Sequence, residues 1–454
     1  MATTLNIYPS VPTACGSRIE LAGLDLWRMA RIDNVFVYPS VIEVDRFQKA
    51  LADTLCQWPF VVGRSRIDSN ERYFIEMCDK PIPVTVNKNY NLVKWPFNSN
   101  VIVDFYENPL STYLDEVQVS KLFVNTEDEP LVRLKLTEIV QSNEWVLGIS
   151  WAHELGDAAS CLSFLNTISC LYQHKEPLIP VPLFERCLWK ENEADPSFLP
   201  LMKHFRDAKT FDEMWKKFMV DQEAYDQVNL CFSGAQLKQL HDLAPQNYQL
   251  TIHDVLIAYI ILTLNTSCYY DDDRHRVLRT NTSINYRGVS DRIAPKSLIA
   301  NAVLMMLSEN VEDPYSLLSI AKTIRQSIVK SRDETFLQRW LATADDAMRK
   351  MMHNDYLADL GFVPNEIIVN SNFRYDWANL VDFGHTDQCR FHTGWSGAFY
   401  LRIFRLNPIL NGDTWLPRDQ DGAEVVFRIE KHLKEKFMNA IKRDMEDNFA
   451  RIKN

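Results

Sequence analysis

The chain has 454 residues, of which 46% are hydrophobic and 24% are charged. These proportions suit a folded globular protein and exclude a disordered or collagen-like chain, and the length allows two or three domains. The 49 Lys and Arg against 60 Asp and Glu leave a net charge of −11, which argues against a broad nucleic-acid-binding face.

The nine cysteines are scattered, and no two of them fit C-x-x-C. The sequence therefore offers no paired zinc ligands and no thioredoxin-like motif, and we expect reduced thiols in a cytoplasmic protein. No signal-peptide pattern opens the chain. The longest apolar run, 255–264, is about half of the ~20 residues that span a membrane. We expect no nucleic acid, membrane or metal as a partner.

The first half of the chain alternates strand and helix signals. Apolar patterning predicts strands at 4–8, 131–140 and 145–151, and helices at 44–55 and 158–172. A Pro- and acid-rich stretch at 176–200 has no clear periodicity, so it is the candidate linker.

The second half repeats this mixed order. A helix is predicted at 237–243, and Thr251 with Asp254 resembles a capping box that opens an apolar helix ending at Leu264. Strands are predicted at 276–285 and 301–307, and 317–352 is predicted to be helical with breaks. A four-residue spacing predicts an amphipathic C-terminal helix carrying Val425, Ile429, Leu433, Phe437 and Ile441. The two halves together predict a two-domain α/β protein.

The chemical motif with the best context is His153-Glu-Leu-Gly-Asp157, directly after the strand predicted at 145–151. No G-x-G, P-loop, G-x-S-x-G or H-E-x-x-H motif occurs, so the usual nucleotide, hydrolase and zinc-protease signatures are missing. Composition alone yields roughly 0.8 such His-to-Asp spacings by chance. A histidine at the carboxyl end of a strand, however, is well placed to face a ligand crevice.

Two interpretations of His153 are open at this stage. In the structural one, the histidine is hydrogen-bonded within a turn and Asp157 caps the next helix. In the functional one, an imidazole with a pKa near ~6.5 takes the proton of an attacking hydroxyl while fixed donors stabilise the carbonyl oxygen of a thioester. Asp157 then either accepts from the imidazole, as in a triad, or holds the loop through a basic partner.

Motifs along nearly the whole chain resemble the BAHD acyltransferases, which use acyl-CoA in specialised metabolism. The sequence HELGD matches the family's HxxxD motif. Four further segments fit their family counterparts in the right order: IYPSVPTACGSRIELAGLDL, LADTLCQWPFVVGR, SINYRGVSDRIAPKSLIANAVLM and VDFGHTDQCRF. The last departs from the family's DFGWG, which is regarded as structural, because His385-Thr386 replaces Trp-Gly. This departure favours a divergent, fungal-type branch.

The resemblance implies a role for each matching residue. His153 is the expected catalytic base, and Asp157 is expected to point away from it and to pair with Arg287. Gly156 would allow the backbone to approach the thioester closely.

Further residues follow from shorter matches. Ser371 is a candidate hydroxyl donor to the tetrahedral intermediate, although a plain strand or turn serine fits as well. Thr251 and Asn372 are expected on the CoA side, where a helix N-terminus suits phosphate. Asp382 is expected to brace the loop after its strand, with Gly384 as structural support.

The resemblance also implies two chloramphenicol-acetyltransferase-like α/β domains with a channel between them. Residues 1–190, together with about 367–391, are expected to form the N-terminal domain. A crossover at 191–212 would lead to the C-terminal domain at 213–454. CoA would enter one mouth of the channel and the acceptor the other, so that transfer is direct and needs no acyl-enzyme.

These inferences predict a monomeric, acyl-CoA-dependent O-acyltransferase with no permanently bound cofactor. The donor is expected to be acetyl-CoA, and the acceptor a hydroxyl of a small, fairly apolar metabolite. Three alternatives stay open: an amine acceptor, a carrier-bound thioester donor, and a non-catalytic member that only binds a metabolite or a protein.

Overall fold

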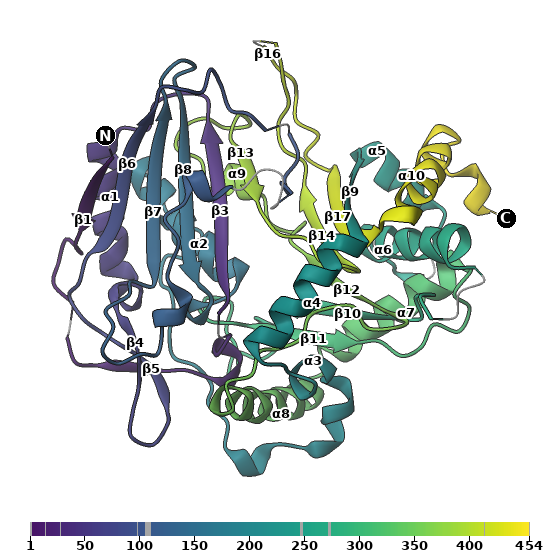
Figure 1. The fold of residues 1–454 in the computed structure, drawn as a ribbon, viewed down its shortest axis with the longest axis horizontal. Helices are drawn as coiled ribbons and strands as arrows, with labels where there is room; N and C mark the ends of the chain where they lie inside the picture. Colours follow the sequence, from purple (N-terminus) through teal and green to yellow (C-terminus); the bar gives the residue numbers. More distant parts are fainter. Residues whose placement is uncertain are drawn as a thin grey trace.

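Two six-stranded sheets divide the molecule into two α/β halves that lie side by side (Figure 1). The structure, a computed structural model, describes residues 2–13, 15–27, 29–97, 99–104, 110–245, 248–270, 274–412 and 414–453. The predicted α/β class is confirmed, and the candidate site lies between the two sheets.

The first sheet comes mostly from the N-terminal half. Its strands, in spatial order, are β1 (Thr3–Ile7), β6 (Ile82–Asn89), β7 (Val132–Ile139), β8 (Glu144–Ala152), β3 (Arg31–Tyr38) and β13 (Arg390–Thr393). All neighbours are antiparallel except the parallel pair β6 and β7. Helices α1 (Val44–Gln57) and α2 (Ala158–Tyr172) pack against each other on one face of this sheet (Figure 1). A small sheet of β2 (Arg18–Glu20), β5 (Tyr73–Glu76) and β4 (Arg64–Ile67) lies beside them.

The second sheet belongs to the C-terminal half. Its spatial order is β11 (Val303–Leu307), β10 (Arg279–Asn285), β12 (Glu366–Ser371), β14 (Tyr400–Arg405), β17 (Ala423–Glu430) and β9 (Tyr225–Phe232). The helices packed with it are α5 (Gly234–Asp242), α6 (Ile252–Thr263), α7 (Leu317–Lys330) and α10 (Lys431–Glu446). Helix α6 is apolar on all sides because it lies in the middle of this layer, where most of its residues are buried. A hairpin of β15 (Leu410–Asn411) and β16 (Thr414–Trp415) projects from this half (Figure 1).

The crossover region runs along a long helix beneath both halves. Residues 191–212 contain the short helices η6 (Glu191–Glu193), η7 (Pro196–Leu201) and α3 (Lys203–Arg206), and all three contact α8 (Glu334–His353). Helix α8 also contacts the turn η1 (Gly23–Asp25) of the first half. Helix α4 (Phe211–Ala224) then leads into the second sheet through β9.

A late segment of the chain completes the first half. Strand β13 pairs with β3, so that Phe391 lies opposite Phe36, and Phe391 stacks on Trp377 of α9 (Trp377–Leu380) at 4.9 Å between ring centroids. Strand β12, in contrast, is buried between β10 and β14 in the second sheet, as its apolar run suits a parallel central strand. The segment expected to join the first half, about 367–391, therefore starts too early in the prediction.

The predicted elements agree with the structure except at the start of the C-terminal helix. Helix α2 has the predicted bounds, and the strands predicted before and after it are present. The region 317–352, predicted to be helical with breaks, is the two helices α7 and α8, and the break lies where Asp333 caps α8 by accepting from the Phe336 backbone N–H at 2.7 Å. The predicted C-terminal helix is wrong at its start: Val425 and Ile429 lie in β17. A four-residue spacing also keeps side chains on one face of a strand, where the period is two.

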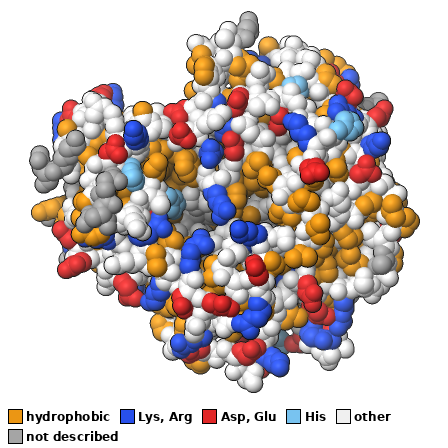
Figure 2. Space-filling view, turned by 180° about the vertical axis from the view of Figure 1, so that it is seen from behind, with side chains coloured by type: hydrophobic (Ala, Val, Ile, Leu, Met, Phe, Trp, Pro, Cys, Tyr) orange, Lys and Arg blue, Asp and Glu red, His pale blue; other side chains and the backbone are white. Residues whose placement is uncertain are grey.

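Among the described residues, no helix is both long and apolar enough to cross a membrane. All nine cysteines are free thiols. The surface seen from behind carries acidic, basic and apolar side chains interspersed, with a hollow near its middle bordered by several Lys and Arg side chains (Figure 2).

Candidate active site

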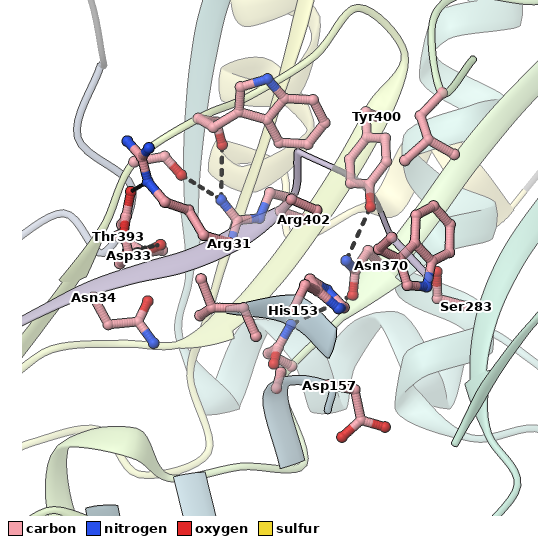
Figure 3. A pocket seen from close by; sticks show the side chains of 18 of the residues that line it. Arg31, Asp33, Asn34, His153, Asp157, Ser283, Asn370, Thr393, Tyr400 and Arg402 are labelled. Atoms are coloured by element: carbon pink, nitrogen blue, oxygen red, sulfur yellow. Dashed lines mark hydrogen bonds and ion pairs between the residues drawn. The ribbon is translucent and has the colours of Figure 1, made fainter. Parts of the chain in front are cut away.

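A cavity of about 370 Å³ lies between the two sheets. This volume is in the range of small-ligand sites. The first half contributes the start of β3, the turn after β8 and the end of β13, and the second half contributes β10, β11, β12 and β14. Much of the wall is aromatic or aliphatic. Polar side chains face the cavity at a limited number of positions, including Arg31, Asp33, Asn34, His153, Ser283, Asn370, Asn372 and Arg402 (Figure 3).

His153 lies on this wall at the first position of a 3-10 turn, His153–Leu155, directly after β8. Its backbone N–H donates to the Ala30 carbonyl at 3.1 Å, and its carbonyl accepts from Asn301 Nδ2 at 2.7 Å. These bonds fix the backbone from both halves of the molecule. Nδ1 of the imidazole is buried without a hydrogen-bond partner in the described structure, so Nε2 is the nitrogen left for a ligand.

The electrostatic surroundings keep the His153 imidazole neutral. Burial lowers its pKa below the ordinary 6.5, and the negative charge of Asp157 offsets only part of this effect. A neutral imidazole near pH 7 can accept a proton, which is the protonation state that a general base requires. The ring of Trp27 lies beside it at 6.0 Å between centroids.

Asp157 binds Arg287 and does not form a triad with His153. Arg287 donates from Nη1 to Oδ2 at 2.7 Å and from Nη2 to Oδ1 at 3.1 Å. The backbone N–H groups of Ser160 and Ala302 donate to the same carboxylate, and Figure 3 shows it turned away from the imidazole. Burial alone would raise the pKa of Asp157, but Arg287 and these N–H groups lower it below its ordinary value.

Gly156 is required by packing inside the turn. Its φ is +147°, a conformation that favours glycine. A Cβ at this position would lie 2.5 Å from Ser160 Oγ and 2.9 Å from the Ala300 carbonyl oxygen. The expected approach of this backbone to a thioester has no counterpart in the cavity wall, which does not include Gly156. Backbone conformation and packing within the protein therefore require glycine at position 156.

The segment around Ser371 faces the cavity through Asn372, which was expected on the ligand side, and Asn370, but not through Ser371. Asn370 and Asn372 line the cavity, whereas Ser371 between them does not, because adjacent side chains of a strand point to opposite faces. The Ser371 hydroxyl instead accepts from the Phe373 N–H at 3.4 Å. Asn372 is 6% exposed, and Ser283 of the neighbouring β10 adds a hydroxyl to the same wall.

Thr251 lies outside the cavity. It is the N-cap of α6, and its hydroxyl donates to Asp254 Oδ2 at 2.8 Å and accepts from Arg325 Nη2 at 2.8 Å. The expectation that Thr251 lines the CoA side has no support in this geometry, because the capping box and Arg325 already use its side chain.

Asp382 holds the turn that replaces the family's DFGWG. Its Oδ1 accepts from the Gly384 N–H at 2.8 Å and from the His385 N–H, and its Oδ2 accepts from the Thr386 hydroxyl at 2.8 Å. Gly384 has a φ of +105°, so glycine suits this turn. The residues that replace Trp-Gly thus supply two of the hydrogen bonds that close the turn, and the turn does not line the cavity.

Several cavity residues had no signal in the motif search, above all Arg402, Asn34 and Asp33. Arg402 interrupts the otherwise apolar run from Phe399 to Phe404, and this interruption is the sequence feature that could have indicated it. Within the described structure, no group of three or more His, Cys, Asp or Glu could hold a metal ion.

Comparisons with known proteins place this site in a family. A family model described as Transferase family matches residues 2–448. A search of curated proteins finds no match. Vinorine synthase has a TM-score of 0.62 at 14% identity, with 96% of this chain and 95% of that chain covered. TRI101 of F. sporotrichioides, solved with coenzyme A and T-2, has a TM-score of 0.60 at 13% identity, with coverages of 95% and 98%.

A further structural neighbour comes from teicoplanin biosynthesis. The X-domain from teicoplanin biosynthesis has a TM-score of 0.55 at 12% identity, with 98% of each chain covered. At these identities the solved structures show a common fold, and the family match over nearly the whole chain carries the classification. The chain belongs to the Transferase family. Within it the protein is a BAHD acyltransferase, as the sequence resemblance predicted.

Proposed function

We propose that the protein transfers an acyl group from coenzyme A to a hydroxyl of a small specialised metabolite, with His153 as the general base. The observation that carries this proposal is the neutral His153 imidazole on the wall of a ligand-sized cavity lined by both halves. A cavity of this position lets a thioester and an acceptor meet at one imidazole, so transfer proceeds directly in a ternary complex. Acetyl-CoA is the proposed donor.

The proposed reaction needs only the side chains of the cavity and the two substrates. His153 takes the proton of the acceptor hydroxyl as its oxygen attacks the thioester carbonyl carbon. The tetrahedral intermediate collapses with cleavage of the C–S bond, and the thiolate of CoA takes the proton back from the imidazolium. The hydroxyl of Ser283 and the amide of Asn372 are the proposed donors for the carbonyl oxygen, since fixed donors stabilise the charge that develops there.

Two further observations support CoA as the donor. TRI101, a structural neighbour, was solved with coenzyme A and T-2 together, so a fold of this type accommodates a CoA molecule and a small molecule at once. The hollow on the rear face has a border of Lys and Arg side chains (Figure 2), which suits the phosphates of CoA.

The test is release of free thiol from acetyl-CoA by the purified protein in the presence of a panel of hydroxylated metabolites. A parallel panel of amines distinguishes O-transfer from N-transfer, and mass spectrometry of the product identifies the acylated position. We expect acceptor-dependent thiol release that His153→Ala slows by roughly 10²–10⁴. Absence of release with acetyl-CoA and with longer acyl-CoA thioesters would refute the proposal in favour of a binding role.

A further inference from the structure

Arg402 is a cavity residue that the proposed reaction does not use. It lies in β14, where Tyr400, Arg402 and Phe404 alternate on one face and all line the cavity (Figure 3). Its guanidinium carbon lies 5.1 Å from the centre of the Phe404 ring. Nη1 donates to the carbonyls of Gly394 at 2.6 Å and Trp395 at 2.7 Å. These contacts hold the guanidinium in place, and no described residue accepts a hydrogen bond from Nη2 or Nε.

Arg402 differs in its lack of a carboxylate from four other arginines with largely buried side chains. These form ion pairs with acids, in the pairs Arg287–Asp157, Arg186–Asp25, Arg390–Glu144 and Arg418–Asp376. No carboxylate of the described residues lies within ion-pair distance of Arg402. Asp33, on the same cavity wall, pairs with Arg31 at 2.7 Å. Within the described part of the chain, no acid therefore neutralises the positive charge of Arg402.

The guanidinium is partly buried and lines the cavity. Burial lowers the pKa of Arg402 to about 10. Arg402 therefore stays protonated at neutral pH, and a partly desolvated cation without a counter-charge is stabilised when an anion binds beside it.

A second unsatisfied donor lies nearby. Asn34 is 2% exposed, lines the cavity, and has a buried Nδ2 without a partner. The pairing of β13 with β3 sets Thr393 opposite Asn34, and the next two residues, Gly394 and Trp395, provide the carbonyls that hold Arg402. The register thus brings an amide donor and a guanidinium donor to one part of the wall.

We propose that Arg402 binds a carboxylate of the acceptor, so that the acceptor class is apolar hydroxy acids. This inference rests on the proposed function, because it places the carboxylate at Arg402 and the reacting hydroxyl at His153. The aromatic side chains of Trp27, Trp395 and Phe404 would contact the apolar body between these two groups. A planar guanidinium with two free donor nitrogens matches a carboxylate in geometry as well as in charge.

The test compares binding of 4-(hydroxymethyl)benzoate, whose hydroxyl and carboxylate lie at opposite ends of an apolar ring, with that of 4-(hydroxymethyl)benzamide, a matched pair that differs only in the carboxylate. Calorimetric titration is performed with the wild type, Arg402→Gln, Arg402→Lys and the control Arg405→Gln. Arg405 is on the same strand and also donates to backbone carbonyls, but it does not line the cavity. We expect wild type and Arg405→Gln to bind the acid roughly tenfold or more tightly than the amide. Arg402→Gln should bind both alike, and Arg402→Lys should keep part of the preference.

Unchanged binding of acetyl-CoA by each variant shows that the variants are folded. A comparison of malonyl-CoA with acetyl-CoA separates the two sources of a carboxylate. If Arg402→Gln removes a preference for malonyl-CoA while acid and amide bind alike, the carboxylate belongs to the acyl group and the assignment to the acceptor is overturned.

If the wild type binds neither the acid nor the amide, or binds both equally with no preference for malonyl-CoA, carboxylate recognition is overturned altogether. The two proposals fail separately. Thiol release from acetyl-CoA without a carboxylate preference overturns this inference alone, and a carboxylate preference without thiol release overturns only the proposed reaction.

Discussion

The Arg287 guanidinium binds both carboxylate oxygens of Asp157, and this ion pair joins the two halves of the molecule. Asp157 caps α2 in the first half, and Arg287 follows β10 in the second. Arg287 also donates to the carbonyls of Leu298 and Ala300, each at 2.7 Å. Since these bonds use the carboxylate and most of the guanidinium, the pair holds the His153 turn against the second half and takes no direct part in proton transfer.

A double-mutant cycle on this pair should show strong coupling. Asp157→Ala and Arg287→Ala should each lower the free energy of unfolding by about 3–5 kcal/mol, because each leaves a buried charge without its partner. The double variant should lose clearly less than the sum, with a coupling of at least ~1 kcal/mol measured by denaturant unfolding.

The surface pair Lys434–Asp226, at 2.8 Å and with both side chains well exposed, is the matched control. Lys434→Ala should cost less than about 1 kcal/mol. Additive losses at Asp157 and Arg287 would contradict the pairing. If the alanine variants do not fold, Asp157→Asn and Arg287→Lys provide a milder cycle with the same expected sign.

Replacement of His153 should affect turnover far more than stability. His153→Ala should lower the rate of acyl transfer by roughly 10²–10⁴, the range for loss of a general base. Its melting temperature should stay close to that of the wild type, because the bonds that fix this turn use backbone atoms. Steady-state thiol release and a thermal melt measure the two effects.

His385→Ala is the matched histidine control. His385 lies in the Asp382 turn, outside the cavity, and binds Asp382 through its backbone N–H. This variant should keep its turnover. A His153→Ala enzyme with near wild-type rate would show that another group removes the proton.

The pH dependence of the reaction should report the lowered pKa of His153. Only the neutral imidazole can accept a proton, so kcat/KM should rise with pH and reach a plateau. Burial places the midpoint of this rise below 6.5, and the acidic limb should disappear from the residual activity of His153→Ala. A midpoint above 6.5 would mean that the imidazole is more exposed to water than the structure shows.

Local sequence signals are sufficient to predict much of the fold and the place of His153, the proposed base, after its strand. The strand before His153 and the helix after Asp157 follow from apolar patterning, and the resemblance to a known family led from HELGD to Arg287. These features depend on short stretches of chain, where periodicity and capping decide the structure. The alternation along β17 was misread as a helix because a spacing of four fits both a helix and one face of a strand.

The cavity wall could not be predicted in the same way. Whether Ser371 or its neighbours Asn370 and Asn372 face the ligand depends on strand register, and a shift of one residue reverses the answer. The position of the Arg402 guanidinium depends on the packing of β14 of one half against the end of β13 in the other. Thr251 carried a correct capping signal, but the sequence could not show that its helix begins away from the cavity.

A buried acid beside the base predicts a further dependence on pH, this time of stability. Glu154 is 2% exposed; Ser65 donates to its Oε2 at 2.6 Å, and its Oε1 has no partner among the described residues. Burial raises the pKa of Glu154 to about 8. The folded protein therefore keeps a proton on Glu154 that the unfolded chain loses at a lower pH. The contribution of Glu154 to the free energy of unfolding is full below about pH 4.5 and is lost as the pH rises towards 8.

Glu154→Gln keeps the shape of the side chain and has no charge to bury, so its stability relative to the wild type should increase with pH. The free energies of unfolding of variant and wild type should be similar near pH 4.5. The difference should then grow in favour of the variant by up to about 1.4 kcal/mol per pH unit towards pH 8. Denaturant unfolding at four pH values measures this slope, and the same measurement on Glu127→Gln, whose side chain is 43% exposed, serves as the control. Because the comparison is between variant and wild type, other buried acids such as Glu424, whose pKa burial raises to about 7, cancel. A constant difference across the range would show that Glu154 is ionised in the folded protein and that a cation or water not seen in its surroundings compensates its charge.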